Sequence, residues 1–179
     1  ERQPKLSRYQ DAWKSVQNTA KRYLKYRSYL NDVLYGGKAK CMFIQQTNLI
    51  FSNYSSKTLM GYYDSSSNNI STRTACTHVL QDKPYVIRAA SCKNSSLYAD
   101  SPIIFSDYTS CDVVRAPHTK DPFDCELWVA EEYITNVPSI CEFAYDVFCN
   151  VTEKYTIFDE SICCQFFKLK TRRQHACFK

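Results

Sequence analysis

The sequence lacks the patterns on which several large classes of protein depend. Among its three glycines there is no glycine-rich phosphate loop, and it carries no recognisable nucleic-acid motif, so nucleic acid is not an expected partner. No run reaches about 18 consecutive apolar residues, so no membrane-spanning helix is expected. The charged start, Glu1 to Lys5, is unlike a signal peptide, and we expect a mature, processed chain.

Catalytic and metal-binding patterns are also missing. The three histidines, His78, His118 and His175, fall on unrelated segments, and there is no Gly-x-Ser-x-Gly elbow. No Cys-x-x-Cys occurs, and the two histidines nearest to a cysteine, His78 after Cys76 and His175 before Cys177, lack the paired spacing of a zinc site. We therefore expect a protein that is not an enzyme and that has no cofactor and no metal.

Cysteine, by contrast, is abundant, with ten residues in this short chain. At such density cysteines persist as disulfides mainly in oxidising compartments. Four Asn-x-Ser/Thr sequons indicate the same setting, because glycan acceptors lie on exposed loops of secretory proteins. These acceptors are Asn53, Asn69, Asn94 and Asn150. The two features together predict a secreted, extracellular glycoprotein.

The composition indicates one strand-rich domain over residues 1–179. Aromatic residues make up 15% of the chain, with 14 Tyr and 10 Phe, and 179 residues suit a single core. Short segments rich in aromatic and β-branched residues follow one another between polar turns, as in an antiparallel all-β domain. We expect eight strands at 22–30, 41–51, 57–63, 72–80, 85–92, 102–108, 111–115 and 125–130.

Two helices are expected beside these strands, a short one at 10–18 and a longer one at 138–149. An apolar stripe with helical spacing runs along the longer segment and should face the strands. The stripe consists of Ile140, Phe143, Ala144, Val147 and Phe148. A short extra strand at 154–158 follows. An eight-stranded antiparallel up-and-down barrel with one late helix against it is the lipocalin arrangement, and it is wide enough for one small ligand.

Short motifs spread over most of the chain carry a family resemblance. Residues 10–15 read Gln-Asp-Ala-Trp-Lys-Ser. The other pieces lie at 31–37, Cys41, 110–114, 125–128 and 137–141. In their residues, order and rough spacing they resemble the tick salivary lipocalins, whose best known members are the histamine-binding proteins. The resemblance implies a secreted salivary barrel that binds a small molecule.

The resemblance also implies two disulfides. One joins Cys111 to Cys141, and the other joins Cys41 to a cysteine near the C-terminus, for which we choose Cys177. Separately from the resemblance, Cys76 and Cys92 lie on neighbouring expected strands across a turn and are a candidate pair. The other four cysteines have no assigned partners; they are Cys125, Cys149, Cys163 and Cys164.

The alternation of side chains along the eighth expected strand, 125–130, predicts a polar group inside the barrel. Leu127 and Val129 share one face of this strand, whereas Glu126 and Trp128 share the other. If the first face lies under Phe143 and Val147 of the helix, Glu126 points inward, where a carboxylate needs a partner. An ammonium ligand is such a partner, and its contact with the Trp128 ring would add roughly 0.5–2 kcal/mol.

The resemblance adds further candidate ligand-binding residues. In the histamine-binding relatives, amines are held at positions resembling Tyr29, Asp32, Tyr35 and Glu126, with Trp128 and Asp112 nearer to a second pocket. The region of Thr19 and the stretch 74–80 lack acids that amine binders carry. The alternative for Glu126 is an internal Lys, Arg or Tyr partner, and the alternative for Asp32 is that it caps a loop.

Two functions are compatible with these features. The first is sequestration of a biogenic amine, histamine or serotonin, which would suppress host inflammation or immunity. The second is carriage of an apolar lipid such as a fatty acid, a leukotriene or cholesterol, or action on a host immune protein or cell. The chain carries a net charge of +5, and its basic tail from about residue 165 could engage an acidic polysaccharide. We expect a monomer.

Overall fold

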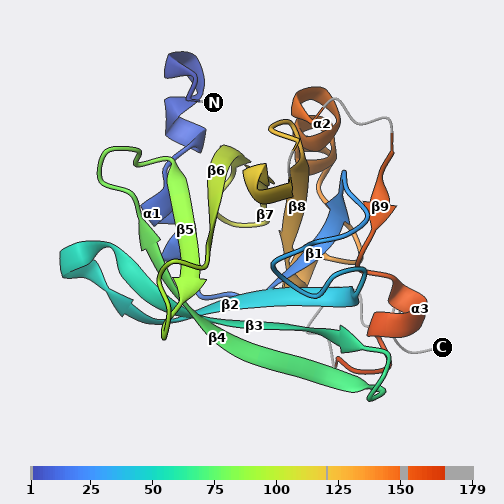
Figure 1. Ribbon diagram of the computed structural model, residues 1–179. Helices are drawn as coiled ribbons and strands as arrows, with labels where there is room; N and C mark the ends of the chain where they lie inside the picture. The colour runs from blue at the N-terminus through green and yellow to red at the C-terminus, as the bar shows by residue number, and fades with distance from the viewer. Residues whose placement is uncertain (1, 120, 150–152, 168–179) are drawn as a thin grey trace.

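An antiparallel barrel of eight strands forms the body of the protein (Figure 1). The computed structural model describes residues 2–119, 121–149 and 153–167. The barrel strands are β1 (Arg22–Arg27), β2 (Lys40–Ile50), β3 (Ser55–Asp64), β4 (Asn69–Val79), β5 (Val86–Ser91), β6 (Tyr98–Ser106), β7 (Cys111–Arg115) and β8 (Cys125–Ala130). Each strand pairs with the next in the chain, and β1 pairs with both β8 and β2, which closes the barrel. All eight predicted strands are present.

A ninth strand, β9 (Tyr155–Thr156), lies at the edge of the barrel beside β1, within the segment predicted for it. The first half of β1 pairs with β2 through Arg22 and Tyr23, whereas its second half pairs with β9 through Tyr26 and Arg27. The chain after the late helix therefore occupies the place where β1 and β2 separate.

Short helices connect and cover the strands. They are η1 (Pro4–Tyr9), α1 (Ala12–Val16), η2 (Phe51–Asn53), η3 (Pro117–Thr119), η4 (Glu131–Tyr133), α2 (Ser139–Phe148) and α3 (Glu160–Cys163). Asp11 caps α1 by accepting a hydrogen bond from the Lys14 amide. No helix among the described residues is long and apolar enough to cross a membrane.

The two ends of the barrel are built differently. At one end, which we call the helix end, α1 places Trp13 edge-on against Phe51 and Tyr54 of the β2–β3 connection. Because strand directions alternate, the connections 28–39, 65–68, 92–97 and 116–124 all lie at the opposite end, which we call the loop end.

Alternating residues of the strands feed two separate hydrophobic clusters. Leu127 and Val129 of β8 belong to a cluster that extends outward to α2, whereas Trp128 belongs to a cluster inside the barrel with Leu24 and Met42. The predicted division of β8 into an outer face and an inner face is therefore what the structure has.

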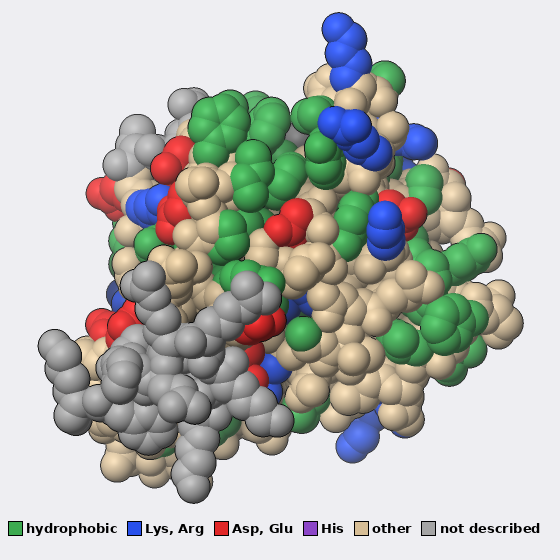
Figure 2. All heavy atoms as spheres, turned by 180° about the vertical axis from the view of Figure 1, so that it is seen from behind, with side chains coloured by type: hydrophobic (Ala, Val, Ile, Leu, Met, Phe, Trp, Pro, Cys, Tyr) green, Lys and Arg blue, Asp and Glu red, His purple; other side chains and the backbone are tan. Residues whose placement is uncertain are grey.

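The predicted apolar stripe of α2 was right for Ala144 and Phe148, which lie in or against the cluster of Leu127 and Val129, and wrong for its other three members. Ile140, Phe143 and Val147 are exposed, and Figure 2 shows hydrophobic side chains gathered where this helix lies. The residues of α2 buried against β7 and β8 are Cys141, Ala144 and Tyr145. The disulfides of Cys141 and of Cys149, just after the helix, join this face to β7 and β8. The covalent bonds therefore fix the orientation of α2, although the neighbouring stripe has more apolar area.

The disulfides correct one predicted pair. Cys41 is joined to Cys163 of α3, not to Cys177, which lies outside the described residues. This bond is possible because α3 packs against β2, where Cys41 begins the strand's buried run. The pairs Cys111–Cys141 and Cys76–Cys92 are as predicted. Of the four cysteines left open, Cys125 is joined to Cys149, and Cys164 is also disulfide-bonded.

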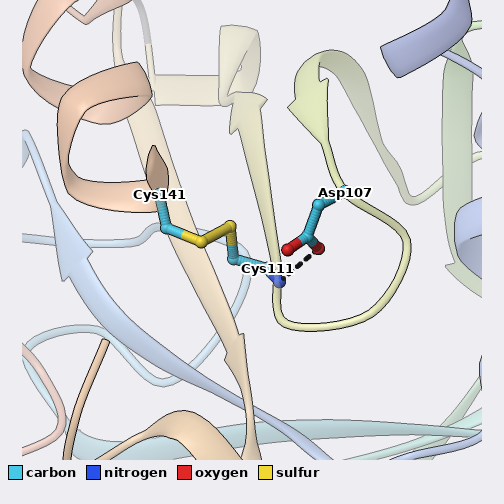
Figure 3. Close-up of side chains that lie close together, drawn as sticks. All are labelled: Asp107, Cys111 and Cys141. Atoms are coloured by element: carbon cyan, nitrogen blue, oxygen red, sulfur yellow. Dashed lines mark hydrogen bonds between the residues drawn. A yellow bond between two sulfur atoms is a disulfide. The ribbon is translucent and has the colours of Figure 1, made fainter. Parts of the chain in front are cut away.

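Figure 3 shows how the Cys111–Cys141 bond anchors α2 to the first residue of β7. Asp107 fixes the turn before β7, because its Oδ1 accepts hydrogen bonds from the amides of Thr109, Ser110 and Cys111. Partial burial acts to raise the pKa of Asp107, but the hydrogen bond from the Ser110 hydroxyl and these amide hydrogen bonds outweigh it, so the pKa is lowered. Asp107 therefore has a structural role.

Candidate functional site

The barrel encloses a cavity of about 360 Å³, within the size range of small-molecule sites. Five of the six predicted ligand-binding residues line it: Asp32, Tyr35, Asp112, Glu126 and Trp128. Tyr29 is not part of the lining, but its hydroxyl contacts both Asp32 and Glu126. The sequence therefore predicted side chains that the fold brings together around one cavity.

The β1–β2 connection that carries Asp32 is held by a fully buried arginine. Arg27 donates from Nη2 to the carbonyls of Leu30, at 2.6 Å, and of Gly37, at 2.7 Å. Asp32 and Gly37 exchange two backbone hydrogen bonds across the connection, and Gly37 has a positive φ of 59°, which favours glycine. The loop is thus tied at its base, and Asp32 has a fixed position.

At the loop end of the cavity, Asp32 and Glu126 lie next to His118. His118 Nε2 is 3.5 Å from Asp32 Oδ1, and the two side chains are only 11% and 4% exposed. Tyr29 donates to Glu126 Oε1 and, at 3.3 Å, to Asp32 Oδ2. Trp128 Nε1 donates to Glu126 Oε2 at 2.8 Å. We call these three titratable residues, Asp32, His118 and Glu126, the loop-end cluster.

The ionisation of the loop-end cluster reflects its burial and its crowding. Burial, followed by the negative charge of Asp32, raises the pKa of Glu126. Burial alone would raise the pKa of Asp32, but His118 and the amides of Leu34 and Tyr35 outweigh it, so this pKa is lowered. Burial acts to lower the pKa of His118, but the neighbouring carboxylates act to raise it and outweigh burial. The pKa of His118 is therefore raised.

At the helix end of the cavity, Asp112 is paired inside the protein. Arg22 Nε lies 2.8 Å from Asp112 Oδ2, and both side chains are almost fully buried. Ser15 of α1 donates to Asp112 Oδ1 at 2.9 Å. The charge of this carboxylate is therefore balanced by an arginine of β1. We call Ser15, Arg22 and Asp112 the helix-end cluster.

Both alternatives that the sequence left open are present in the structure. Glu126 has an internal tyrosine partner, Tyr29, and Asp32 caps its loop by accepting from the amides of Leu34 and Tyr35, each at 2.9 Å. However, Tyr29 and Trp128 are neutral donors and leave the charge of Glu126 uncompensated. Among the described residues, no lysine or arginine forms an ion pair with either carboxylate.

The sequence predicted neither Ser15 and Arg22 of the helix-end cluster nor His118 of the loop-end cluster. His118 was set aside because the three histidines fall on unrelated segments, yet η3 lies in the β7–β8 connection, at the same end as the loop of Asp32. The signal was available, because alternate connections of an up-and-down barrel meet at one end.

The comparison with known families agrees with this architecture. A family model described as tick histamine binding protein matches residues 1–165. The chain belongs to this family. A male-specific histamine-binding salivary protein of Rhipicephalus appendiculatus is 26% identical over 186 residues, which cover 89% of this chain and 84% of that protein.

Two solved structures show how far the fold extends beyond close relatives. Japanin from Rhipicephalus appendiculatus, solved bound to cholesterol, superposes with a TM-score of 0.57 at 16% identity, covering 80% of this chain and 95% of that one. The amine-binding protein of Rhodnius prolixus, solved as its tryptamine complex, has a TM-score of 0.51 at 12% identity, covering 85% and 88%. At these identities the likeness shows the fold alone, a lipocalin barrel.

Proposed function

We propose that the protein binds a biogenic amine, histamine or serotonin, in its barrel and lowers the concentration of the free amine, without catalysis. The observation that carries this proposal is the position of Asp32 and Glu126, two buried carboxylates on the cavity wall that have no lysine or arginine partner among the described residues. Two buried carboxylates that share only His118 as a titratable counter-charge are better compensated when a further cation joins them.

Trp128 supports the same ligand class. Its indole lines the cavity, and it is held in place by its hydrogen bond to Glu126. An ammonium group between the carboxylates would lie beside an aromatic surface, which contributes roughly 0.5–2 kcal/mol. Relatives named for histamine, and a tryptamine-bound protein of the same fold, agree with such a ligand.

Calorimetry with matched ligands tests the proposal. Serotonin and N-acetylserotonin share the ring and its hydroxyl, but the acetylated compound has no positive charge. We expect serotonin or histamine to bind and N-acetylserotonin to bind at least about tenfold more weakly, because it cannot pair with the carboxylates. Equal binding of the charged and the neutral compound would rule out recognition of an amine by the loop-end cluster.

A second candidate ligand is an apolar lipid, such as a fatty acid, a leukotriene or cholesterol. The observation in its favour is the apolar part of the lining, which includes Met42, Ile44, Met60, Ile87 and Val114. The neutralised helix end would accept such a molecule more readily than a second amine. Mass spectrometry of the ligand that co-purifies with the protein would distinguish the two. If neither class binds, a host immune protein or cell becomes the target to test.

The setting we propose is secretion into saliva as a glycosylated monomer. Asn53, Asn69 and Asn94 are exposed, as glycan addition requires, whereas Asn150 lies outside the described residues. The basic side chains of η1, which project from the barrel in Figure 2, and the basic tail are the groups that would meet an acidic polysaccharide. A mass decrease on endoglycosidase treatment of the native protein would test glycosylation, and light scattering would test the monomer.

A further inference from the structure

The loop-end cluster has the spacing of a metal site. One ligand atom from each of Asp32, His118 and Glu126 can be chosen so that all three lie within 4.8 Å of one another. His118 Nε2 and Asp32 Oδ1 are 3.5 Å apart. Two ligands bonded at about 2.1 Å to a tetrahedral ion lie about 3.4 Å apart, so this pair is already at coordination distance.

The ring of His118 is mostly buried, and its nearest charged neighbour is Asp32, whose Oδ1 lies 3.5 Å from Nε2. Neither of its nitrogens has a hydrogen-bond partner among the described residues, although both are shielded from solvent. An imidazole whose nitrogens are shielded in this way loses the hydrogen bonds that it makes in water. A cation bound at Nε2 would restore one strong interaction and at the same time approach the two carboxylates.

The groups around the carboxylates resemble the outer shell of a metal site. The amides of Leu34 and Tyr35 fix Asp32, and the hydroxyl of Tyr29 and the indole of Trp128 fix Glu126. Outer hydrogen bonds of this kind orient ligating carboxylates and limit their motion. The same hydrogen bonds would hold the two carboxylates beside His118 when an ion binds.

We propose that Asp32, His118 and Glu126 bind a divalent transition ion of the Zn²⁺ type. One imidazole and two carboxylates suit Zn²⁺ and its neighbours better than the soft ions that prefer thiolates. Three protein ligands leave a fourth position, which would face the cavity. No metal was expected from the sequence because its cysteines and histidines lack zinc spacing, whereas these ligands come from three distant segments.

A second group with suitable spacing, Asp107, Cys111 and Cys141, does not compete with this proposal. Figure 3 shows that the two sulfur atoms of this group are bonded to each other. Sulfurs joined in a disulfide are not thiolates and therefore are poor metal ligands. The loop-end cluster is thus the stronger candidate among the described residues.

The ion and the proposed amine would use the same two carboxylates, so their binding should be mutually exclusive. Competition must be measured with serotonin or tryptamine, because the imidazole and amine of histamine themselves chelate metal ions. We expect saturating Zn²⁺ to weaken serotonin binding at least about tenfold. Zn²⁺ binding without any amine binding would uphold the metal site and reject the proposed function, so the two proposals fail separately.

The direct test is titration of the full chain with Zn²⁺ by calorimetry, with the His118→Gln variant and, as a matched control, His78→Gln. His78 lies on β4 and is not part of the loop-end cluster. We expect one ion per chain, at least about tenfold weaker binding in His118→Gln, and no change in His78→Gln. Equal affinity of His118→Gln and the unmodified chain, or no binding to the latter, would overturn the proposal.

A measurement on the unmodified chain covers the case in which His118→Gln does not fold. Paramagnetic Co²⁺ should shift the proton signals of the rings of His118 and Trp128, because one ring would bind the ion and the other is hydrogen-bonded to a ligand of it. Signals of both rings that stay unchanged at saturating Co²⁺ would contradict the site. Shifts confined to other histidines would do so as well.

Discussion

The two ends of the cavity treat a buried carboxylate in opposite ways. At the helix end, Asp112 is paired with Arg22 and hydrogen-bonded to Ser15. At the loop end, Asp32 and Glu126 lie together, their side-chain hydrogen-bond donors Tyr29 and Trp128 are neutral, and the titratable His118 lies 3.5 Å from Asp32. The carboxylate of the helix end is thus balanced by an arginine, whereas those of the loop end have no lysine or arginine partner among the described residues. We infer that one barrel can use buried carboxylates both for stability, at the helix end, and for binding, at the loop end.

The largest expected effect is the loss of stability in Asp112→Asn. This change keeps the shape of the side chain but leaves the buried Arg22 without its counter-charge, which typically costs about 3–5 kcal/mol of the free energy of unfolding. Chemical denaturation of the variant and of the unmodified chain measures this loss of stability.

In the control, Glu126→Gln, stability should stay equal or rise, because the raised pKa of Glu126 means that its ionised form is unfavourable in the folded state. A similar loss in both variants would remove the distinction between the two ends.

The second effect is on affinity. Glu126→Gln should weaken binding of an amine about tenfold to a hundredfold, because a charge-assisted interaction of about 1.5–3 kcal/mol becomes a neutral one. Calorimetry with serotonin measures this loss. The control is Glu142→Gln on α2, whose carboxylate pairs with Lys154 outside the barrel and should leave affinity unchanged. Full affinity in Glu126→Gln would show that the loop end does not recognise the amine.

The sequence predicted those features that consecutive residues determine. It did not predict those that depend on how distant segments pack together. The alternation of β8 placed Glu126 and Trp128 inside the barrel, because strand parity is a property of consecutive residues. The buried face of α2 was misplaced, because two neighbouring stripes are both apolar and only the disulfide partners of Cys141 and Cys149 decide between them. The partner of Cys41 depended on where α3 packs, which no local pattern shows.

The site itself was predicted in part for the same reason. The family resemblance and the alternation of side chains along β8 predicted the carboxylates of the site. They did not predict Arg22 and His118, the residues that pair with those carboxylates. Arg22 and Asp112 are 90 positions apart and meet because β1 and β7 both flank β8. His118 and Asp32 meet because two alternate connections share the loop end. Such pairings depend on the closure of the barrel and not on any segment of the chain.

A third, smaller effect is a dependence of amine binding on pH. The pKa of His118 is raised, so its imidazolium forms as the pH falls and competes with the ligand for the carboxylates. The pKa of Glu126 is also raised, so protonation of this carboxylate at low pH removes negative charge and weakens amine binding as well. Tyr29, whose pKa is raised by burial, stays neutral. A primary amine stays charged throughout, so affinity should increase from about pH 5 to about pH 8.

Calorimetry at several pH values, in buffers of different ionisation enthalpy, measures both this slope and the protons released. His118→Gln should reduce the slope and the proton release, and it should bind the amine more tightly than the unmodified chain at low pH. His78→Gln is again the matched control and should keep the full slope. An affinity that is constant with pH, or that falls as the pH rises, would contradict a cationic ligand at the loop end.

The smallest effect, an almost unchanged affinity, is expected when both charges of the helix end are removed together. In the double variant Arg22→Met, Asp112→Leu no charge is left unpaired, and hydrophobic replacement of a buried ion pair is often neutral or stabilising by about 1–4 kcal/mol. Affinity for serotonin should then change by less than about threefold, or about 0.7 kcal/mol. A loss above about tenfold in this folded variant would mean that the amine also depends on the helix end, and the two clusters would then form one binding site.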